Sequence, residues 1–307
     1  MPVLARVALA VVCIAVAAEL ICRFGVGLGD PPLFRIDSDI EYLAAPSRCH
    51  QRFGNSVCFN SLSMRAEEPP PRAAGAARIL VLGDSIIHGG VLTDQAELAT
   101  SLLQKGLGRE AWVGNASAPS WGPANLLAYT RRFGWLQADL AILVLSSHDL
   151  TDLPEFRQDY GADYPIRPPH LALEEAVTRY GPRVFPPLAA LSPQATPPRR
   201  TYTEDQRTRE GVAALADLLR QMKAGAGAAY VVLYPTVTEL DGGPAPERAL
   251  EIAEIRKLGL PYIDLIGAKT WRRSYYRDDI HPNAEGQAAL AAILRCLWDG
   301  RGAACAQ

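Results

Sequence analysis

The chain has 307 residues, of which 49% are hydrophobic and 21% charged, and its formal net charge is −2. A chain of this length can bury the core of one sizeable domain and still carry additional segments. The near-neutral balance lacks a basic stripe with interleaved aromatic residues, so we expect no nucleic-acid partner.

The first distinctive segment is an apolar run over residues 7–22 that follows Arg6. A membrane-spanning helix needs about 20 apolar residues, so this run suffices only with help from its flanks. Residues 15–17, Ala-Val-Ala, also resemble a signal-peptidase site. We interpret residues 1–29 as a membrane anchor or signal segment, and we favour an uncleaved anchor because the apolar pattern continues past Ala17 to Val26. The remainder is then expected to face the periplasm or the cell exterior, and to be secreted if the segment is cleaved.

The six cysteines fit an oxidising compartment. Two lie inside the N-terminal segment. The other four form local pairs of equal separation, Cys49 with Cys58 and Cys296 with Cys305, which suggests two disulfides, although sequence alone does not fix the connectivity. A zinc site is the alternative interpretation, but no two cysteines have the C-x-x-C spacing.

Residues 30–77 show little periodicity and are predicted to form an irregular connector. Residues 79–82 then give an aliphatic run typical of a strand buried on both faces. The run stops at Gly83-Asp84-Ser85. Parallel sheets place reactive groups at the carboxyl ends of their central strands, which makes Ser85 a candidate nucleophile. The tripeptide also suits an ordinary strand-to-helix turn, so other segments must show whether Ser85 is catalytic.

Strands and helices alternate along the rest of the chain, which predicts an α/β fold, a three-layer α/β/α sandwich with a central parallel sheet. Two helix starts are marked by capping-box pairs, Asp94 with Glu97 and Thr203 with Gln206. Further strands are expected over residues 111–114, 139–146, 228–234 and 261–265, and helices over residues 94–107, 124–133, 203–223, 246–258 and 284–298.

A proline-, tyrosine- and arginine-rich stretch, residues 151–200, interrupts this alternation. It is too long for an ordinary connection within a compact domain. An insertion beside a strand end is commonly a lid or a substrate-binding loop, and a disordered excursion is the alternative.

Asp278 and His281 lie three residues apart on a turn before the last predicted helix. A carboxylate there can orient one imidazole nitrogen while the other faces a pocket. A serine hydroxyl becomes an effective nucleophile only when such a base takes its proton. The same Asp-x-x-His-Pro pattern also occurs as a capped helix start with a surface histidine.

Taken together, these segments resemble the GDSL, or SGNH, hydrolase family over about residues 60–297. Gly83-Asp84-Ser85 looks like the first block of that family, residues 115–122 like its second, and residues 278–286 like its last. The resemblance implies a flavodoxin-like SGNH fold with Ser85 as nucleophile, His281 as base and Asp278 as its orienting carboxylate. It implies no metal and no other cofactor.

Two positions depart from the family pattern. Ser120 stands where the second block has an oxyanion-hole glycine, and His148 stands where the third block has an asparagine. Ser120 still offers a backbone N–H, and an imidazole N–H can replace the amide donor. The oxyanion hole implied by the resemblance therefore consists of Ser85, Ser120 and His148.

The remaining histidines and the acidic residues beside the site have simpler interpretations. His88 is expected at the surface of a helix start, with a place in the pocket lining as the alternative, and His50 and His170 are expected in polar loops. A metal site formed by His88, His148 and His281 is an alternative that the serine chemistry makes unnecessary. Asp84 and Asp149 are expected to accept hydrogen bonds from turn backbone.

The N-terminal segment and residues 60–65 also resemble a membrane-anchored bacterial envelope subgroup of the family, associated with exopolysaccharide modification. Residues 78–307 are thus expected to form a serine esterase acting on acyl esters, O-acetyl groups in particular, of an envelope or exported polysaccharide. Its partners would be an acylated carbohydrate or another small ester, and the membrane. The alternatives are an acyltransferase on the same substrates, and a non-catalytic glycan-binding or assembly protein with a degenerate oxyanion hole.

Overall fold

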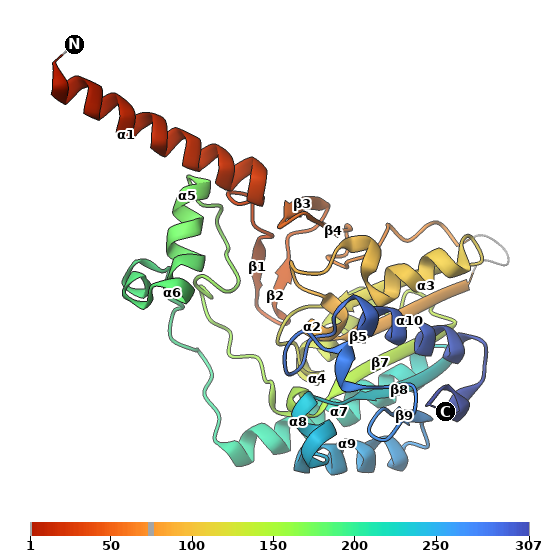
Figure 1. Cartoon of the computed structure of the whole chain (residues 1–307). Helices are drawn as coiled ribbons and strands as arrows, with labels where there is room; N and C mark the ends of the chain where they lie inside the picture. The colour runs from red at the N-terminus through yellow and green to blue at the C-terminus, as the bar shows by residue number, and fades with distance from the viewer. Residues whose placement is uncertain (1, 73–76, 307) are drawn as a thin grey trace.

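A computed structural model describes residues 2–72 and 77–306 of the chain (Figure 1). Its centre is a five-stranded sheet in the order β6-β5-β7-β8-β9, in which every pairing is parallel. Numbered from the first strand of this sheet, the order is 2-1-3-4-5, the flavodoxin-like arrangement. The predicted fold class is confirmed. The strands are β5 (Ala77–Gly83), β6 (Ala111–Ser117), β7 (Leu140–Ser146), β8 (Ala228–Tyr234) and β9 (Tyr262–Asp264).

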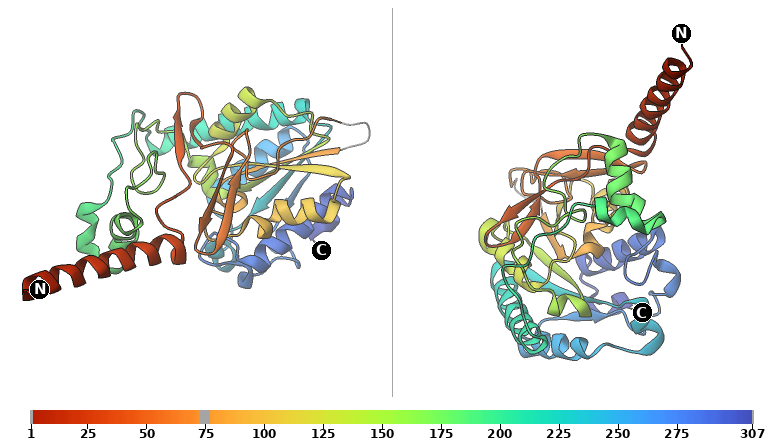
Figure 2. Two further views of the ribbon diagram at one scale, coloured as in Figure 1. Left: turned by 90° about the horizontal axis from the view of Figure 1, so that it is seen from above. Right: turned by 90° about the vertical axis from the view of Figure 1, so that its left-hand side faces the viewer.

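Helices cover both faces of the sheet (Figures 1 and 2). Along β5, Ile79 and Val81 face one hydrophobic core, whereas Leu80 and Leu82 face the other. All four side chains are fully buried, which explains the continuous aliphatic run in the sequence. One layer contains α3 (Ala99–Leu107) and α10 (Ala284–Trp298), and the other contains α4 (Pro123–Phe133), α7 (Glu204–Gly225) and α9 (Pro246–Lys257).

The chain leaves the two central strands in opposite directions. From β5 it crosses to β6 on one side, and from β7 it crosses to β8 on the other. Such a reversal opens a crevice at the carboxyl ends of the two strands, where open α/β sheets bind their ligands. Ser85 follows β5 and His148 follows β7, so both lie at this edge.

The predicted helices and strands of the sheet region are present with small shifts at their ends. The stretch that follows Asp94 begins as a 3₁₀ turn, η2 (Gln95–Glu97), and α3 starts only at Ala99. Thr203 caps α7 as expected, its hydroxyl accepting a hydrogen bond from the Gln206 N–H at 3.2 Å. The remaining short helices and turns are α2 (Ser85–His88), η3 (Ser147–Thr151), α8 (Val237–Gly242), η6 (Arg273–Tyr275) and η7 (Gly302–Ala306).

The segment predicted as an irregular connector contains two antiparallel hairpins. Their apolar side chains, among them Tyr42, Val57 and Phe59, are buried in one of the two cores of the sheet. Strands of four or five residues give too little alternation to be recognised in the sequence. They are β1 (Phe34–Asp37), β2 (Glu41–Ala44), β3 (Arg48–Arg52) and β4 (Asn55–Phe59).

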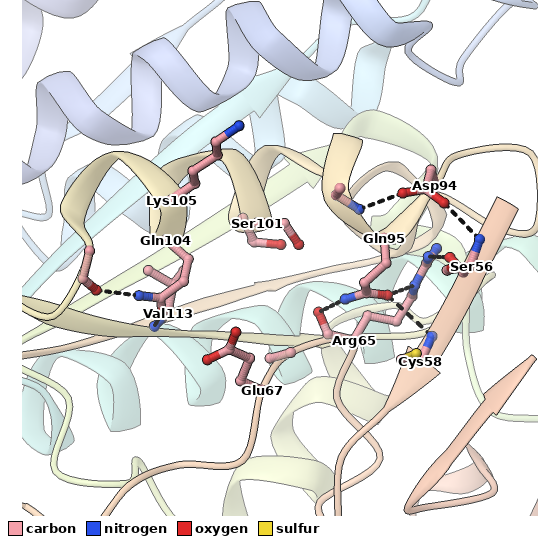
Figure 3. A pocket seen from close by; sticks show the side chains of 14 residues that line it. Ser56, Cys58, Arg65, Glu67, Asp94, Gln95, Ser101, Gln104, Lys105 and Val113 are labelled. Atoms are coloured by element: carbon pink, nitrogen blue, oxygen red, sulfur yellow. Dashed lines mark hydrogen bonds between the residues drawn. The ribbon is translucent and has the colours of Figure 1, made fainter.

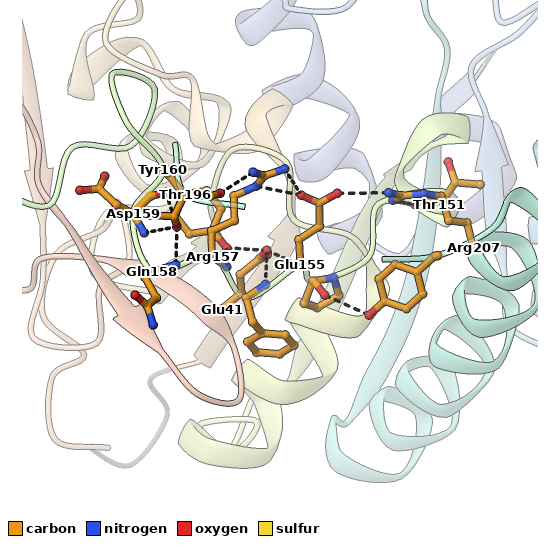
Figure 4. A network of polar contacts seen from close by, with 12 residues as sticks. Glu41, Thr151, Glu155, Arg157, Gln158, Asp159, Tyr160, Thr196 and Arg207 are labelled. Atoms are coloured by element: carbon orange, nitrogen blue, oxygen red, sulfur yellow. Dashed lines mark hydrogen bonds and ion pairs between the residues drawn. The ribbon is translucent and has the colours of Figure 1, made fainter. Parts of the chain in front are cut away.

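The insertion combines irregular segments with short helices. Its first part is held by the buried Glu41 carboxylate, which accepts hydrogen bonds from the Glu155 backbone N–H and the Tyr160 hydroxyl, each at 2.7 Å (Figure 4). Arg207 of α7 pairs with the Glu155 side chain at 3.1 Å. The second part consists of α5 (Ala172–Glu175), η4 (Ala176–Tyr180), α6 (Gly181–Val184) and η5 (Pro186–Leu191).

The N-terminal segment forms α1 (Val3–Leu20), which continues as the π-helical η1 (Ile21–Val26). These 24 residues form one helical segment long and apolar enough to cross a membrane, and none of it is buried. It projects from the rest of the molecule in Figure 1. Length and composition of this kind fit both a membrane anchor and a signal segment.

Both expected disulfides are present. Cys49 and Cys58 are directly opposite each other across the β3–β4 hairpin. Cys296 and Cys305 connect the end of α10 to η7. Cys13 and Cys22 of the N-terminal segment are free.

We predict that removing the first disulfide with Cys49→Ser/Cys58→Ser lowers the free energy of unfolding by roughly 2–3 kcal/mol, because the unfolded chain regains loop entropy. Cys296→Ser/Cys305→Ser provides a matched comparison, since both bridges span a sequence separation of 9. The entropic account requires similar losses from both double variants. Urea unfolding of the full chain in detergent measures them, and two unchanged midpoints would contradict the prediction.

Candidate active site

Ser85 is the first residue of α2, directly after the carboxyl end of β5. The Asp84 side chain caps this helix by accepting a hydrogen bond from the Ile86 N–H at 2.9 Å. Two buried amides hold α2 from neighbouring elements. Asn115 of β6 donates to the Ile87 carbonyl at 2.9 Å, and Gln287 of α10 donates to the Ile86 carbonyl at 3.3 Å. The serine is therefore fixed at the edge of the sheet while its side chain stays partly exposed.

The Ser85 hydroxyl, the His281 ring and the Asp278 carboxylate form one hydrogen-bonded series. Ser85 Oγ lies 3.0 Å from His281 Nε2. His281 Nδ1 lies 2.9 Å and 3.0 Å from the two oxygens of Asp278. Because Nδ1 faces a carboxylate, it carries the ring proton, and the Nε2 lone pair is left to accept the Ser85 proton.

The Asp278 carboxylate is stabilised in its ionised form. Burial acts to raise its pKa, but hydrogen bonds from the His281 and Ile280 backbone N–H groups and from the His281 ring outweigh burial and lower the pKa below its ordinary value. At neutral pH the imidazole therefore faces a full negative charge.

The turn that carries His281 is fixed by the start of α10. Asn283 caps this helix by accepting a hydrogen bond from the Gly286 N–H at 2.9 Å, and its amide donates to the Ser274 carbonyl at 2.7 Å. A side chain at Gly286 would place its Cβ 2.2 Å from the Tyr275 carbonyl oxygen. Only glycine allows this close approach of helix and turn.

Ser120 lies on the turn after β6 with a φ of 55°, in the left-handed region that favours glycine. Its hydroxyl forms a hydrogen bond with Tyr164 of the insertion at 3.0 Å. Gly122, two residues later, lets this turn touch the His148 turn, since a Cβ there would lie 2.1 Å from the Asp152 carbonyl oxygen. The structure thus brings the Ser120 turn and the His148 turn into contact.

His148 forms an ion pair with two buried carboxylates. Its Nε2 lies 3.1 Å from Asp149 Oδ1 and 3.4 Å from Asp84 Oδ2, and its Nδ1 lies 3.1 Å from Ser146 Oγ. The Ser85 hydroxyl also lies 3.2 Å from Asp84 Oδ2. His148 and Ser85 therefore share one carboxylate oxygen.

The negative charges around His148 change its titration. Burial acts to lower the pKa of the ring, but Asp149, Asp84 and Asp152 together raise it to about 10. Burial in turn raises the pKa of Asp152 to about 6. Burial and the charge of Asp84 also raise the pKa of Asp149 above its ordinary value, against the opposing charge of His148. The cluster as a whole favours the protonated form of His148 in the neutral range, where an ordinary histidine would lose its proton. Asp84 and Asp149 each also accept a hydrogen bond from turn backbone, as the sequence suggested.

Two other histidines differ from expectation. His88 is buried rather than at the surface, stacked on Phe59, and its Nδ1 accepts a hydrogen bond from the Gly90 N–H at 3.2 Å. Burial, followed by the charge of Arg65, lowers the pKa of His88. His50 is buried in β3 instead of a polar loop. The Phe59 and Arg65 contacts come from distant sequence, which is why they could not be foreseen.

His88, His148 and His281 do not form a shared group of metal-ligand atoms in the part of the chain that the structure describes. Among residues 2–72 and 77–306, the one grouping with suitable geometry is Asp84, His148 and Asp149, whose potential ligand atoms lie within 4.8 Å of one another. The ion pair around His148 accounts for this proximity without a metal.

A cavity of about 610 Å³ lies beside Arg65, away from the predicted site residues (Figure 3). Arg65 is fully buried and donates to the carbonyls of His88 and Gly90, each at 2.7 Å. It thereby fixes the loop that follows the Ser85 helix. The sequence offered no signal for this role beyond the position of Arg65 in the segment at residues 60–65.

One family model and several solved structures are similar to this chain. The model of the GDSL-like lipase/acylhydrolase family matches residues 81–289. No curated protein matches the chain. Similar solved structures include LAE5, an alpha/beta hydrolase from the metagenome of Lake Arreo, Spain (15% identity, 75% of this chain and 97% of that chain, TM-score 0.45). A variant of Axe2, an acetyl xylan esterase from Geobacillus stearothermophilus, has 14% identity over 71% of this chain and 93% of its own, with a TM-score of 0.44. TesA has 17% identity over 72% and 96%, with a TM-score of 0.41.

We predict that the His148 ring stays protonated through neutral pH and that Asp149→Asn lowers its pKa, because the substitution removes the nearest negative charge. Nuclear magnetic resonance of the labelled histidine side chains over a pH series measures both effects. His148→Asn identifies the resonance by its loss. A wild-type His148 signal that titrates near neutral pH would refute the prediction.

Proposed function

The chain belongs to the GDSL-like lipase/acylhydrolase family, and we propose that it is a serine esterase that removes O-acetyl groups from a cell-envelope or exported polysaccharide. The observation that carries the catalytic part of this proposal is the hydrogen-bonded series from Ser85 through His281 to Asp278. No cofactor is needed for this chemistry.

In the proposed reaction, Ser85 Oγ attacks the ester carbonyl while His281 Nε2 takes the hydroxyl proton. His281 then returns this proton to the leaving sugar oxygen as the ester C–O bond breaks, which leaves an acetyl group on Ser85. A water molecule then attacks the acetyl-serine while His281 takes one of its protons. His281 passes this proton to Ser85 Oγ as the bond between Oγ and the acetyl carbon breaks and acetate leaves. Asp278 holds the ring orientation and stabilises its positive charge during each step.

The developing oxyanion would be met by the backbone N–H groups of Ser85 and Ser120 and by the charge of His148. The left-handed backbone at Ser120 supports its assignment to the position that the family fills with glycine. Both His148 nitrogens already contact neighbouring oxygens, so we assign the ring a mainly electrostatic contribution. A fixed positive charge beside Ser85 favours the negatively charged intermediate.

The exposure of the site supports a large substrate. The side chains of His281 and Asp278 remain 32% and 48% exposed, so a polymer chain has direct access to them. The N-terminal apolar helix and the two disulfides support a membrane-anchored protein that faces the periplasm or the cell exterior.

We predict that Ser85→Ala and His281→Ala each lower acetate release from acetylated polysaccharides by a factor on the order of 10⁶, and that the double variant is hardly worse, because the two residues act as one unit. Asp278→Asn should also impair turnover by favouring the wrong ring tautomer. Ser101→Ala, beside the distant cavity, is the matched serine control and should keep full activity.

A fluorophosphonate probe adds a test that does not depend on the substrate. Labelling of the wild-type chain at Ser85 supports the esterase. A chain that is neither labelled nor active would favour a glycan-binding protein instead, and full activity of Ser85→Ala would remove the nucleophile assignment.

A separate prediction concerns His148. His148→Ala should lower kcat by a factor on the order of 10²–10³ with little change in KM, because the lost interaction acts on the transition state. His148→Asn should retain more activity than His148→Ala, since the amide restores the donor typical of the family. Steady-state kinetics compares the two variants, and an unchanged kcat in His148→Ala would make His148 a bystander.

A further inference from the structure

We propose that residues 171–191, from Leu171 to the end of η5, form an interfacial unit that rests on the phospholipid bilayer crossed by α1. Leu171, Val184, Phe185 and Leu191 would enter the boundary between headgroups and acyl chains. This inference rests on the proposed membrane anchoring of the chain.

The interfacial unit concentrates the exposed apolar side chains of the molecule. Outside residues 3–26, seven large hydrophobic side chains are exposed in the part of the chain that the structure describes, and four of them belong to this unit. Val184 is 89% exposed, more than any large apolar side chain of α1. A cluster of this kind on a surface commonly marks a contact with a membrane or another partner.

The position of the unit identifies the membrane as that partner. α5 begins beside the C-terminal part of α1 (Figures 1 and 2). The Glu19 carboxylate of α1 accepts hydrogen bonds from the Ala172 and Leu173 backbone N–H groups at 3.0 and 2.8 Å. Arg23, one turn further along, donates to the same carboxylate at 2.8 Å. The first turn of the unit is thus bonded to the anchor itself.

A buried ion pair also fixes α5 against β3 and the residues that follow the anchor. Glu175 of α5 pairs with Arg52 of β3, and both side chains are buried. Glu175 also accepts a hydrogen bond from the Gly29 N–H at 2.7 Å, and Arg52 donates to the Gly27 carbonyl at 2.6 Å. Separating such a pair leaves a buried charge unpaired, which is strongly unfavourable.

The length of the anchor determines how deep the interfacial unit lies in the bilayer. Its 24 residues span about 36 Å as a helix, a little more than the roughly 30 Å hydrocarbon core of a bilayer. Glu19 and Arg23 lie near the C-terminal end of this span, where charged side chains reach the headgroup layer. Since α5 is bonded to Glu19, the unit begins at the same level.

The polar side chains of the unit match this environment. The guanidinium groups of Arg179 and Arg183 lie 5.6 and 5.5 Å from the Tyr180 ring centre. Arginine and tyrosine are the residues that favour the headgroup region, where lipid phosphates accept hydrogen bonds from arginine. Apolar side chains beside arginines are the composition of an interfacial helix.

The test uses the full chain reconstituted in vesicles of phosphatidylcholine and phosphatidylglycerol, with or without bromine on the acyl chains near the headgroup. Val184→Trp adds one tryptophan to the proposed contact, and Leu250→Trp adds one to an exposed apolar position of α9 as a matched control. We expect brominated lipid to reduce the added fluorescence of Val184→Trp and to leave that of Leu250→Trp unchanged. Phe185→Trp, a conservative aromatic replacement, should repeat the effect.

The outcomes separate this inference from the proposals on which it rests. If the wild-type chain does not co-float with vesicles in a density gradient, the proposed membrane anchor is wrong and this inference is wrong with it. If the chain floats but Val184→Trp is quenched no more than Leu250→Trp, the interfacial unit is overturned while anchor and esterase stand. Blue-shifted emission without quenching by brominated lipid would mean that a protein covers this face, and would overturn the inference too. Loss of probe labelling at Ser85 would concern only the esterase.

Discussion

The contact between Ser85 and His281 is the constraint on which the site depends. The two residues are 196 positions apart in sequence, and their reacting atoms lie 3.0 Å apart. Ser85 is fixed at the end of β5, whose carboxyl end must face the same edge as those of its parallel neighbours. His281 reaches that edge because α10 packs beside α3 and carries the preceding turn with it. Gln287 joins the two sides directly, since it bonds both α2 and the start of α3.

The electrostatics around this contact follow from burying acids beside the nucleophile. Asp84 and Asp149 are almost inaccessible, and two unpaired carboxylates at such a position would repel each other and the developing oxyanion. The imidazolium of His148 compensates for this charge, whereas a neutral amide at the same position could only hydrogen-bond to it. Because Ser85 also contacts Asp84, this compensated carboxylate lies directly beside the nucleophile.

The sequence predicted the elements with a regular apolar pattern and the polar residues that follow the strand ends. The aliphatic runs of β5, β7 and β8 and the capped start of α7 identified the fold, and the polar residues after those strands placed Ser85 and the His148 turn at one edge. The ordered hairpins escaped prediction because their strands are too short to show a period. The burial of His88 and the ion pair of His148 also escaped it, since each depends on neighbours from distant segments. Local patterns carry no information about such contacts.

The insertion connects the site to the anchor. It starts beside the His148 turn, touches Ser120 through Tyr164, and then continues into the unit bonded to Glu19. Between the end of η1 and the start of β1 lie only residues 27–33, a length of about 25 Å when fully extended. Bonds to Gly27 and Gly29 shorten this reach further. If α1 spans a bilayer, the start of β1 is thereby held within about 25 Å of its surface, and the same insertion that reaches Ser120 is bonded to the anchor.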